Sequence, residues 1–350
     1  MNLLKKIVNN LAQLLILYLN IGIIHAHTPS MTELQEVSLH GSKQWIYITG
    51  QQESNPVLLV LHGGPGFAML PLFHEKLPEL ETTFTVVNWD QRGAGKSYSN
   101  TIPTDSMTLN QLVEDAHELT QILKKKFHKN RIFLLGHSSG SIIGVRLIRQ
   151  YPEDYSSYIG VGQVVNFAEN ENDSYDFALK SAIQNNNRKA EKQLKATGRP
   201  DKQGDYRTEE GYEITSHWVE YFGGSLSNHS NLDTLYDLIF SHSVYKGAEK
   251  KILKGYEFSQ SIFEDNQMRE FDLVKELQGV AIPVYILAGR NDFDTPVTLI
   301  KKYFDQLNIP SKKYIEFSNS AHFPFYEEPK QFVSTMNSIL QEATKQNLIS

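Results

Sequence analysis

An apolar run leads directly into a glycine-flanked serine, and this junction constrains the fold more than any other feature of the chain. The run IFLL at 132–135 predicts a buried strand, and it enters the hexapeptide GHSSGS at 136–141. Apolar residues then recur at helical spacing over 142–148, until Pro152 ends the helix. A strand, G-x-S-x-G and a helix in this order are typical of a sharp turn that exposes a serine hydroxyl above a sheet. The pattern predicts Ser138 as a nucleophile.

The rest of the chain alternates predicted strands with predicted helices. A hairpin is expected over 34–49, with its turn at 40–43, before the first fully apolar strand. Continuous apolar runs of this kind are typical of strands buried on both faces of a parallel sheet. Further strands are expected at 57–61, 84–89, 131–135, 158–163, 284–288 and 314–317, and helices at 108–127, 296–307 and 329–345. The alternation predicts an α/β fold with a mostly parallel, doubly wound sheet.

The pattern changes over 164–279, where helices dominate and no buried strand is expected. This segment is interpreted as a helical lid inserted between two core strands, above their carboxyl ends. The α/β core then consists of a first part, 30–163, and a second part, 280–350.

Residues 1–26 have the features of an export signal. Lys5 and Lys6 precede an apolar stretch over 11–24, and the small residue Ala26 follows it. Polar residues interrupt the stretch, which is short for a membrane span. We therefore expect a secreted or periplasmic protein, with an uncleaved membrane anchor as the alternative.

Composition excludes several classes of function. The chain has no cysteine, which rules out disulfides, thiolate metal sites and a cysteine nucleophile. Its formal net charge of −6 gives no electrostatic reason to expect nucleic acid as a partner.

A serine nucleophile needs a base, and the base needs an acid to orient it. For a serine on this kind of turn the chain order is serine, acid, histidine. His322 follows the last predicted strand, and it is the one of twelve histidines in that position. The loop after 284–288 offers two acids: Asp292 is the predicted partner, and Asp294 is interpreted as the cap of the next helix.

An oxyanion hole requires backbone N–H groups beside the nucleophile. Ser139, directly after the nucleophile, is expected to supply one of them. The loop HGGPG at 62–66 follows the strand 57–61, and its glycines allow the backbone to approach a substrate closely. Gly64 is the predicted second donor, and Gly63 has a supporting role.

With these residues in place, the chain resembles the α/β-hydrolase superfamily, and within it the prolyl iminopeptidase-like group. The resemblance covers roughly 35–345 and is carried by HGGPG at 62–66 followed by DQRGAGKS at 90–97. It implies that Asp90 and Arg92 shape and support the pocket. The elbow departs from the GGSWG usual in that group, because His137 and Ser139 replace its second glycine and its tryptophan.

The combined prediction is acyl transfer to water, with no metal and no organic cofactor. The expected substrate is a short peptide or amide with a free N-terminal residue, proline first. An ester or lactone is the alternative within hydrolases, and a non-catalytic binding protein on the same scaffold is the alternative outside them.

A substrate with a free amine requires carboxylates in the pocket, because an unpaired cation in a closed site is costly. The segment 162–171 leaves a core strand and enters the lid, so Glu169 or Glu171 could lie above Ser138. Solvated glutamates on a lid helix are the alternative interpretation.

The leader makes one prediction. Mass spectrometry of the mature protein from its native host should find an N-terminus close to His27, because cleavage follows a small residue such as Ala26. Recovery of the intact segment 1–26 in the membrane fraction would instead support the anchor.

Overall fold

The computed structural model describes residues 31–349, apart from 209, 228–231 and 265. The predicted leader, 1–26, lies outside the described residues. No helix within the described part of the chain is long and apolar enough to cross a membrane.

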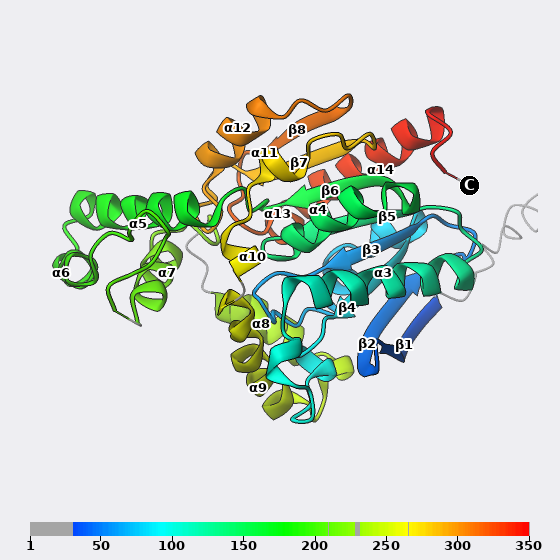
Figure 1. The fold of residues 1–350 in the computed structure, drawn as a ribbon, viewed down its shortest axis with the longest axis horizontal. Helices are drawn as coiled ribbons and strands as arrows, with labels where there is room; N and C mark the ends of the chain where they lie inside the picture. Colours follow the sequence, from blue (N-terminus) through cyan, green and yellow to red (C-terminus); the bar gives the residue numbers. More distant parts are fainter. Residues whose placement is uncertain (1–30, 209, 228–231, 265, 350) are drawn as a thin grey trace, which may run out of the picture.

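The strands of the described chain form one eight-stranded sheet, in the order β1-β2-β4-β3-β5-β6-β7-β8 (Figure 1). β2 pairs antiparallel with β1 and β4, and every pairing from β4 to β8 is parallel. The mostly parallel sheet predicted from the sequence is therefore confirmed. The strands are β1 (Met31–Leu39), β2 (Ser42–Gly50), β3 (Val57–Leu61), β4 (Thr85–Asp90), β5 (Ile132–His137), β6 (Tyr155–Val161), β7 (Val284–Gly289) and β8 (Lys312–Phe317).

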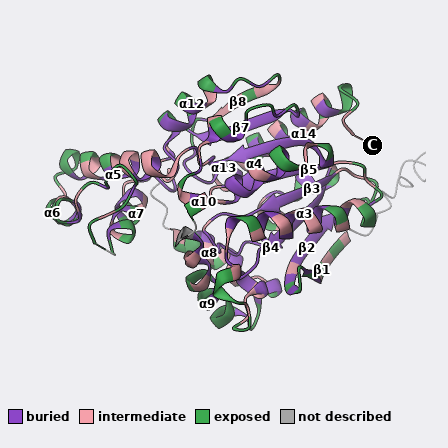
Figure 2. Ribbon diagram, in the orientation of Figure 1, coloured by how far each residue is buried: buried purple, intermediate pink, exposed green. Residues whose placement is uncertain are grey.

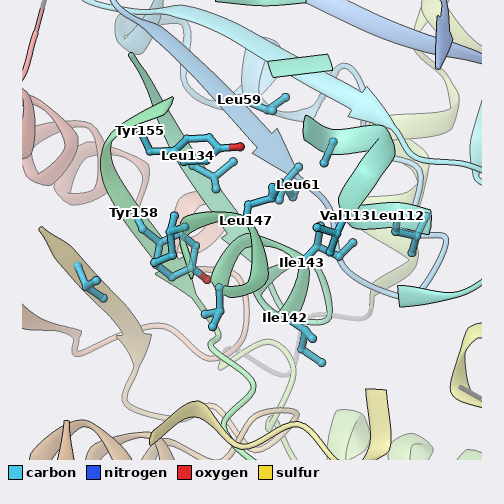
Figure 3. Close-up of a cluster of buried hydrophobic side chains, with 14 of the residues drawn as sticks. Leu59, Leu61, Leu112, Val113, Leu134, Ile142, Ile143, Leu147, Tyr155 and Tyr158 are labelled. Carbon is cyan, nitrogen blue, oxygen red and sulfur yellow. The ribbon is translucent and has the colours of Figure 1, made fainter. Parts of the chain in front are cut away.

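Helices cover both faces of the sheet, because alternate side chains of each central strand point to opposite sides. Leu59 and Leu61 of β3 face a core formed with α3 (Leu109–Lys126), α4 (Gly140–Gln150), α11 (Leu273–Glu276) and α12 (Val297–Gln306). Part of this core is drawn in Figure 3. Leu58 and Val60 face the other core, with α2 (Leu72–Lys76), α13 (Pro324–Glu327) and α14 (Pro329–Lys345). The central strands are accordingly buried, and exposed residues lie on the outer helix surfaces (Figure 2).

Between β6 and β7, the described elements are helices. They are α5 (Phe167–Gln184), α6 (Arg188–Thr197), α7 (Gly211–Tyr221), α8 (Leu232–Phe240), α9 (Glu249–Ser259), α10 (Asn266–Arg269) and α11, with 3₁₀ turns at Ser243–Tyr245 and Gln260–Glu264. α5, α6 and α7 project beyond the sheet and enclose a small core of their own around Trp218 (Figure 1). The helices of this insertion follow the carboxyl end of β6, which is also the edge at which Ser138 lies.

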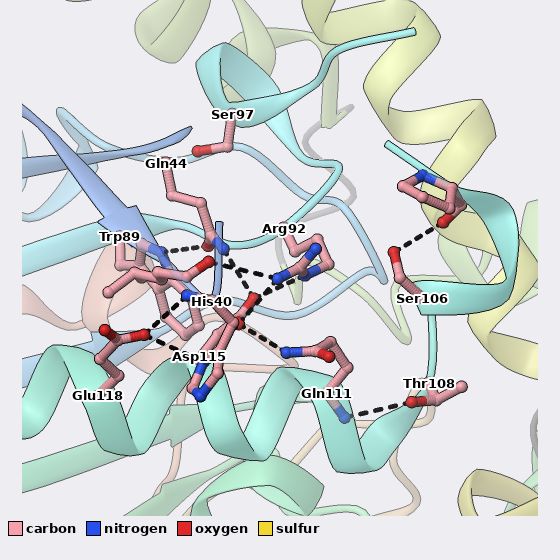
Figure 4. Close-up of polar contacts among 12 residues, drawn as sticks. His40, Gln44, Trp89, Arg92, Ser97, Ser106, Thr108, Gln111, Asp115 and Glu118 are labelled. Atoms are coloured by element: carbon pink, nitrogen blue, oxygen red, sulfur yellow. Dashed lines mark hydrogen bonds and ion pairs between the residues drawn. The ribbon is translucent and has the colours of Figure 1, made fainter. Parts of the chain in front are cut away.

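A buried ion pair joins the Asp90–Ser97 loop to the core. Arg92 donates from Nε to Asp115 Oδ2 (2.7 Å) and from Nη2 to Asp115 Oδ1 (2.9 Å). Gln44 of β2 and Gln111 of α3 donate to the same carboxylate (Figure 4). Both members of the ion pair are buried, so the surrounding hydrogen bonds replace the lost solvent contacts of Asp115.

Arg92→Ala should lower the free energy of unfolding by about 3–5 kcal/mol, because it leaves the Asp115 carboxylate buried without its cation. Arg199→Ala is the matched control: Arg199 makes the same bidentate contact with Asp176, but both side chains are half exposed. The Arg199→Ala substitution should lower the free energy of unfolding by about 1 kcal/mol or less. Urea unfolding measures both values, and equal small losses would contradict the structural role given to Arg92.

Candidate active site

Ser138 lies at the end of β5, in a backbone conformation that few non-glycine residues adopt. Its φ is +52°, in the left-handed region. The turn is crowded on both sides: a β-carbon at Gly63 would lie 2.6 Å from Ser138 Cβ, and one at Gly140 would lie 2.4 Å from the carbonyl oxygen of His62. The strand-to-helix elbow expected from the sequence is thus present, with Ser138 at its apex.

His322 and Asp292 come from the loops after β8 and β7, and they form a hydrogen bond. His322 Nδ1 lies 2.9 Å from Asp292 Oδ2, and both residues are buried. Thr295 fixes the carboxylate by donating two hydrogen bonds to it, one from its backbone N–H and one from its hydroxyl, and each has a length of 2.8 Å. A carboxylate accepts the proton of Nδ1, which leaves Nε2 as the basic nitrogen of the imidazole.

The charge on Asp292 sets the protonation of His322. Burial acts to lower the pKa of the imidazole, but the negative charge of Asp292 and its hydrogen bond outweigh burial. Asp294 adds a smaller effect in the same direction, and the pKa of His322 is raised to about 9.

Two cavities meet at Ser138. The larger, of about 160 Å³, contains His322 in its wall. The smaller, of about 70 Å³, contains Ser139. Gly64 lines both cavities, so the two residues predicted to supply the oxyanion hole both border the smaller cavity together with Ser138.

The larger cavity is acidic. Glu171 and Asp294 line both cavities, and Glu220 of α7 lines the larger one. Aromatic side chains complete the wall of the larger cavity: Phe67, Tyr212, Tyr236, Tyr256, Phe293 and Phe323. No group of three or more metal-ligating side chains in the described chain is arranged to hold a metal ion.

Asp294 does not have the role predicted for it. Pro296 precedes α12, and no side chain caps that helix. Asp294 lies partly buried in the cavity wall instead, where Ser225 Oγ donates to its Oδ1 at a distance of 2.9 Å. Burial raises the pKa of Asp294 to about 6, although the positive charge of His322 acts in the opposite direction.

The two glutamates proposed from the sequence lie in different places. Glu171 is in the cavity wall, where the Tyr206 hydroxyl donates to it over 3.3 Å. Burial raises the pKa of Glu171 to about 7. Glu169 pairs with Lys302 (2.6 Å) and Tyr303 (2.9 Å) and lines neither cavity. Residues two apart on a helix point in nearly opposite directions, so only one of the two can face Ser138.

The two glycine-containing loops hold each other in place. The backbone N–H of Gln91 donates to His62 Nε2 (3.1 Å), and the Gln91 side chain donates to the His62 carbonyl (2.8 Å). Asp90 accepts a hydrogen bond from the hydroxyl of Tyr245, a residue of the insertion, over 2.7 Å. Asp90 and Arg92 bind other protein groups and line neither cavity, in keeping with supporting roles.

Comparison with known proteins gives a consistent result. A family model of the alpha/beta hydrolase fold matches residues 56–329. The chain is 31% identical over 310 residues to the probable aminopeptidase YbaC of Bacillus subtilis, covering 88% of this chain and 96% of that protein. It is 27% identical over 306 residues to a proline iminopeptidase of Clostridium botulinum, with coverages of 86% and 95%. The solved structure of a Mycobacterium smegmatis proline iminopeptidase matches with a TM-score of 0.65 at 18% identity, covering 89% of this chain and 98% of that one. The fold and the resemblance predicted from the sequence are confirmed.

Replacing Asp292 and replacing Asp294 should change the pKa of His322 by different amounts. Asp292→Asn should lower the pKa of His322 far below 9, because burial then acts without its main opposing charge. Asp294→Asn should lower it by less, since Asp294 makes a smaller contribution. NMR titration of the His322 ring protons measures both shifts. If the pKa of His322 shifts further in the Asp294 variant than in the Asp292 variant, then Asp294 and not Asp292 is the main partner of His322.

Proposed function

The chain belongs to the α/β hydrolase family and is a hydrolase, and we propose that it is an aminopeptidase that removes an N-terminal residue, proline first, from short peptides and amides. The observation that carries this proposal is the pair of carboxylates beside Ser138, the buried Glu171 and the partly buried Asp294. The probable aminopeptidase and the proline iminopeptidase among its relatives support it.

In the proposed reaction, Ser138 attacks the substrate carbonyl while His322 accepts the serine proton at Nε2. Asp292 holds the imidazole in the required tautomer and stabilises its positive charge. The backbone N–H groups of Gly64 and Ser139 stabilise the oxyanion. His322 then protonates the leaving amine, and water, activated by the same imidazole, hydrolyses the acyl-enzyme. These steps use protein groups and water alone.

The location of the carboxylates fits an α-amine. In an aminopeptidase substrate only one carbon separates the free amine from the carbonyl that is attacked. The groups that bind the amine must therefore border the same space as the nucleophile. Glu171 and Asp294 meet this requirement, because both line the two cavities that meet at Ser138. Neither carboxylate forms an ion pair within the described chain, so a substrate ammonium would be their cation.

The amine also acts on the base. An ammonium bound near Glu171 and Asp294 brings positive charge into the cavity that His322 lines. A neighbouring like charge disfavours protonation, so the bound substrate lowers the pKa of His322 from its value of about 9 in the free enzyme. Substrate binding thereby favours the neutral form of the imidazole, which is the form that accepts the Ser138 proton.

Three substrates test the proposal: a prolyl amide with a free amine, the same amide with its amine acylated, and a neutral ester. We expect cleavage of the free amide and loss of cleavage on acylation. Glu171→Gln should lower kcat/KM for the free amide by about 30-fold or more, the cost of breaking a buried charge pair. The same variant should change hydrolysis of the ester far less.

Glu169→Gln is the matched control, because it removes a carboxylate of the same helix that pairs with Lys302 and lines neither cavity. It should leave all three rates near those of the parent, and Ser138→Ala should abolish them. Equal cleavage of the free and acylated amides would reject the aminopeptidase proposal and leave the esterase or lactonase alternative. Unchanged turnover in Ser138→Ala would reject the serine mechanism itself.

A further inference from the structure

His322 is held at its backbone as well as at its side chain. Its N–H donates to the carbonyl oxygen of Ser225, in the insertion, over 3.0 Å. Its own carbonyl oxygen lies 3.0 Å from Nε2 of His137, the residue that directly precedes Ser138. With the Asp292 hydrogen bond, three separate parts of the fold therefore fix this one residue.

His137 is suited to donate this hydrogen bond permanently. A carbonyl oxygen can only accept, so Nε2 of His137 carries the hydrogen, and in the neutral imidazole Nδ1 is then unprotonated. The pKa of His137 is held well below its ordinary value by burial, and the positive charge of His322 acts in the same direction. The ring packs 4.7 Å from that of His322, 5.0 Å from Phe323 and 4.9 Å from Phe325, measured between centroids.

We propose that His137 is a positioning residue for the reaction: its Nε2–H holds the backbone carbonyl of His322 and so fixes the base relative to the nucleophile. This inference rests on the proposed roles of Ser138 and His322. Ser138 and His322 come from distant parts of the chain, whereas His137 and Ser138 share a peptide bond. Movement of His322 relative to Ser138 must therefore stretch or break this hydrogen bond. Displacements of about 1 Å in reacting groups can cost about two orders of magnitude in rate.

The test compares His137→Gln with His137→Met. The two side chains are unbranched and similar in length, but only glutamine can donate to the His322 carbonyl. The first readout is the rate at which a small fluorophosphonate modifies Ser138. Intact-protein mass spectrometry measures this rate. In that reaction the Ser138 oxygen bonds to phosphorus, fluoride leaves, and the serine proton passes to His322. The second readout is kcat and KM for whichever of the three substrates the parent enzyme cleaves.

We expect His137→Met to slow both the modification and kcat by about five- to tenfold or more, the effect of one lost hydrogen bond between neutral groups. KM should change less than kcat, because the hydrogen bond is made to the backbone of His322 and not to the substrate, although His137 also lines the larger cavity. His137→Gln should recover most of the rate. His137→Phe, which keeps a ring against Phe323 and Phe325, replaces the methionine variant if that variant does not fold.

The outcomes separate this proposal from the proposed function. If the fluorophosphonate does not modify Ser138 in the parent, the serine mechanism fails and this inference fails with it. If the parent is modified but a folded His137→Met or His137→Phe variant reacts at the parental rate, only the role of His137 is rejected. Equal impairment of the glutamine and methionine variants also rejects it, because packing alone would then explain the effect.

Discussion

The left-handed turn at Ser138 is the constraint on which the rest of the site depends. A non-glycine residue in that conformation costs about 1–3 kcal/mol unless its surroundings enforce it. Here the enforcement comes from parallel pairing of β3 with β5 and from the start of α4, which bring Gly63 and Gly140 against the turn. The same close packing places the 62–66 loop against the turn. Gly64 therefore lies beside Ser138 in the wall of the smaller cavity.

The second organising feature is an excess of buried negative charge around a single base. Asp292 and Glu171 are buried and Asp294 is partly buried near His322, and desolvation raises the pKa values of Asp294 and Glu171. Carboxylates are costly to bury without a cation, and among the cavity residues the positive charge of His322 offsets part of the effect of burial on the pKa of Asp294. On the aminopeptidase proposal, this site favours a positively charged ligand over a neutral one. The electrostatics and the aminopeptidase proposal therefore rest on the same residues.

The sequence allowed prediction of those parts of the protein that local pattern determines. The strand, elbow and helix around Ser138 are contiguous in the chain, and the loops carrying Asp292 and His322 each directly follow a strand. The direction of side chains in the insertion was not predictable in the same way. Glu169 and Glu171 are equivalent by composition, and only the orientation of α5 decides that Glu171 reaches the cavity. Glu220 carried no motif at all, and no sequence pattern indicates the contact of His137, because its partner is a backbone carbonyl far along the chain.

The Asp294 assignment failed for a related reason. An aspartate before Pro296 has the form of a helix cap, but Asp292 already accepts the N–H and hydroxyl of Thr295. Asp294 instead accepts from Ser225, whose carbonyl oxygen receives the His322 N–H, while the Phe293 N–H donates to Gly224. The short segment Gly224–Ser225 thus joins the insertion to the acid loop and to the base at once. Because the insertion also supplies Glu171 and Glu220, this segment links the proposed substrate-binding carboxylates to the proposed base in the mechanism that we propose.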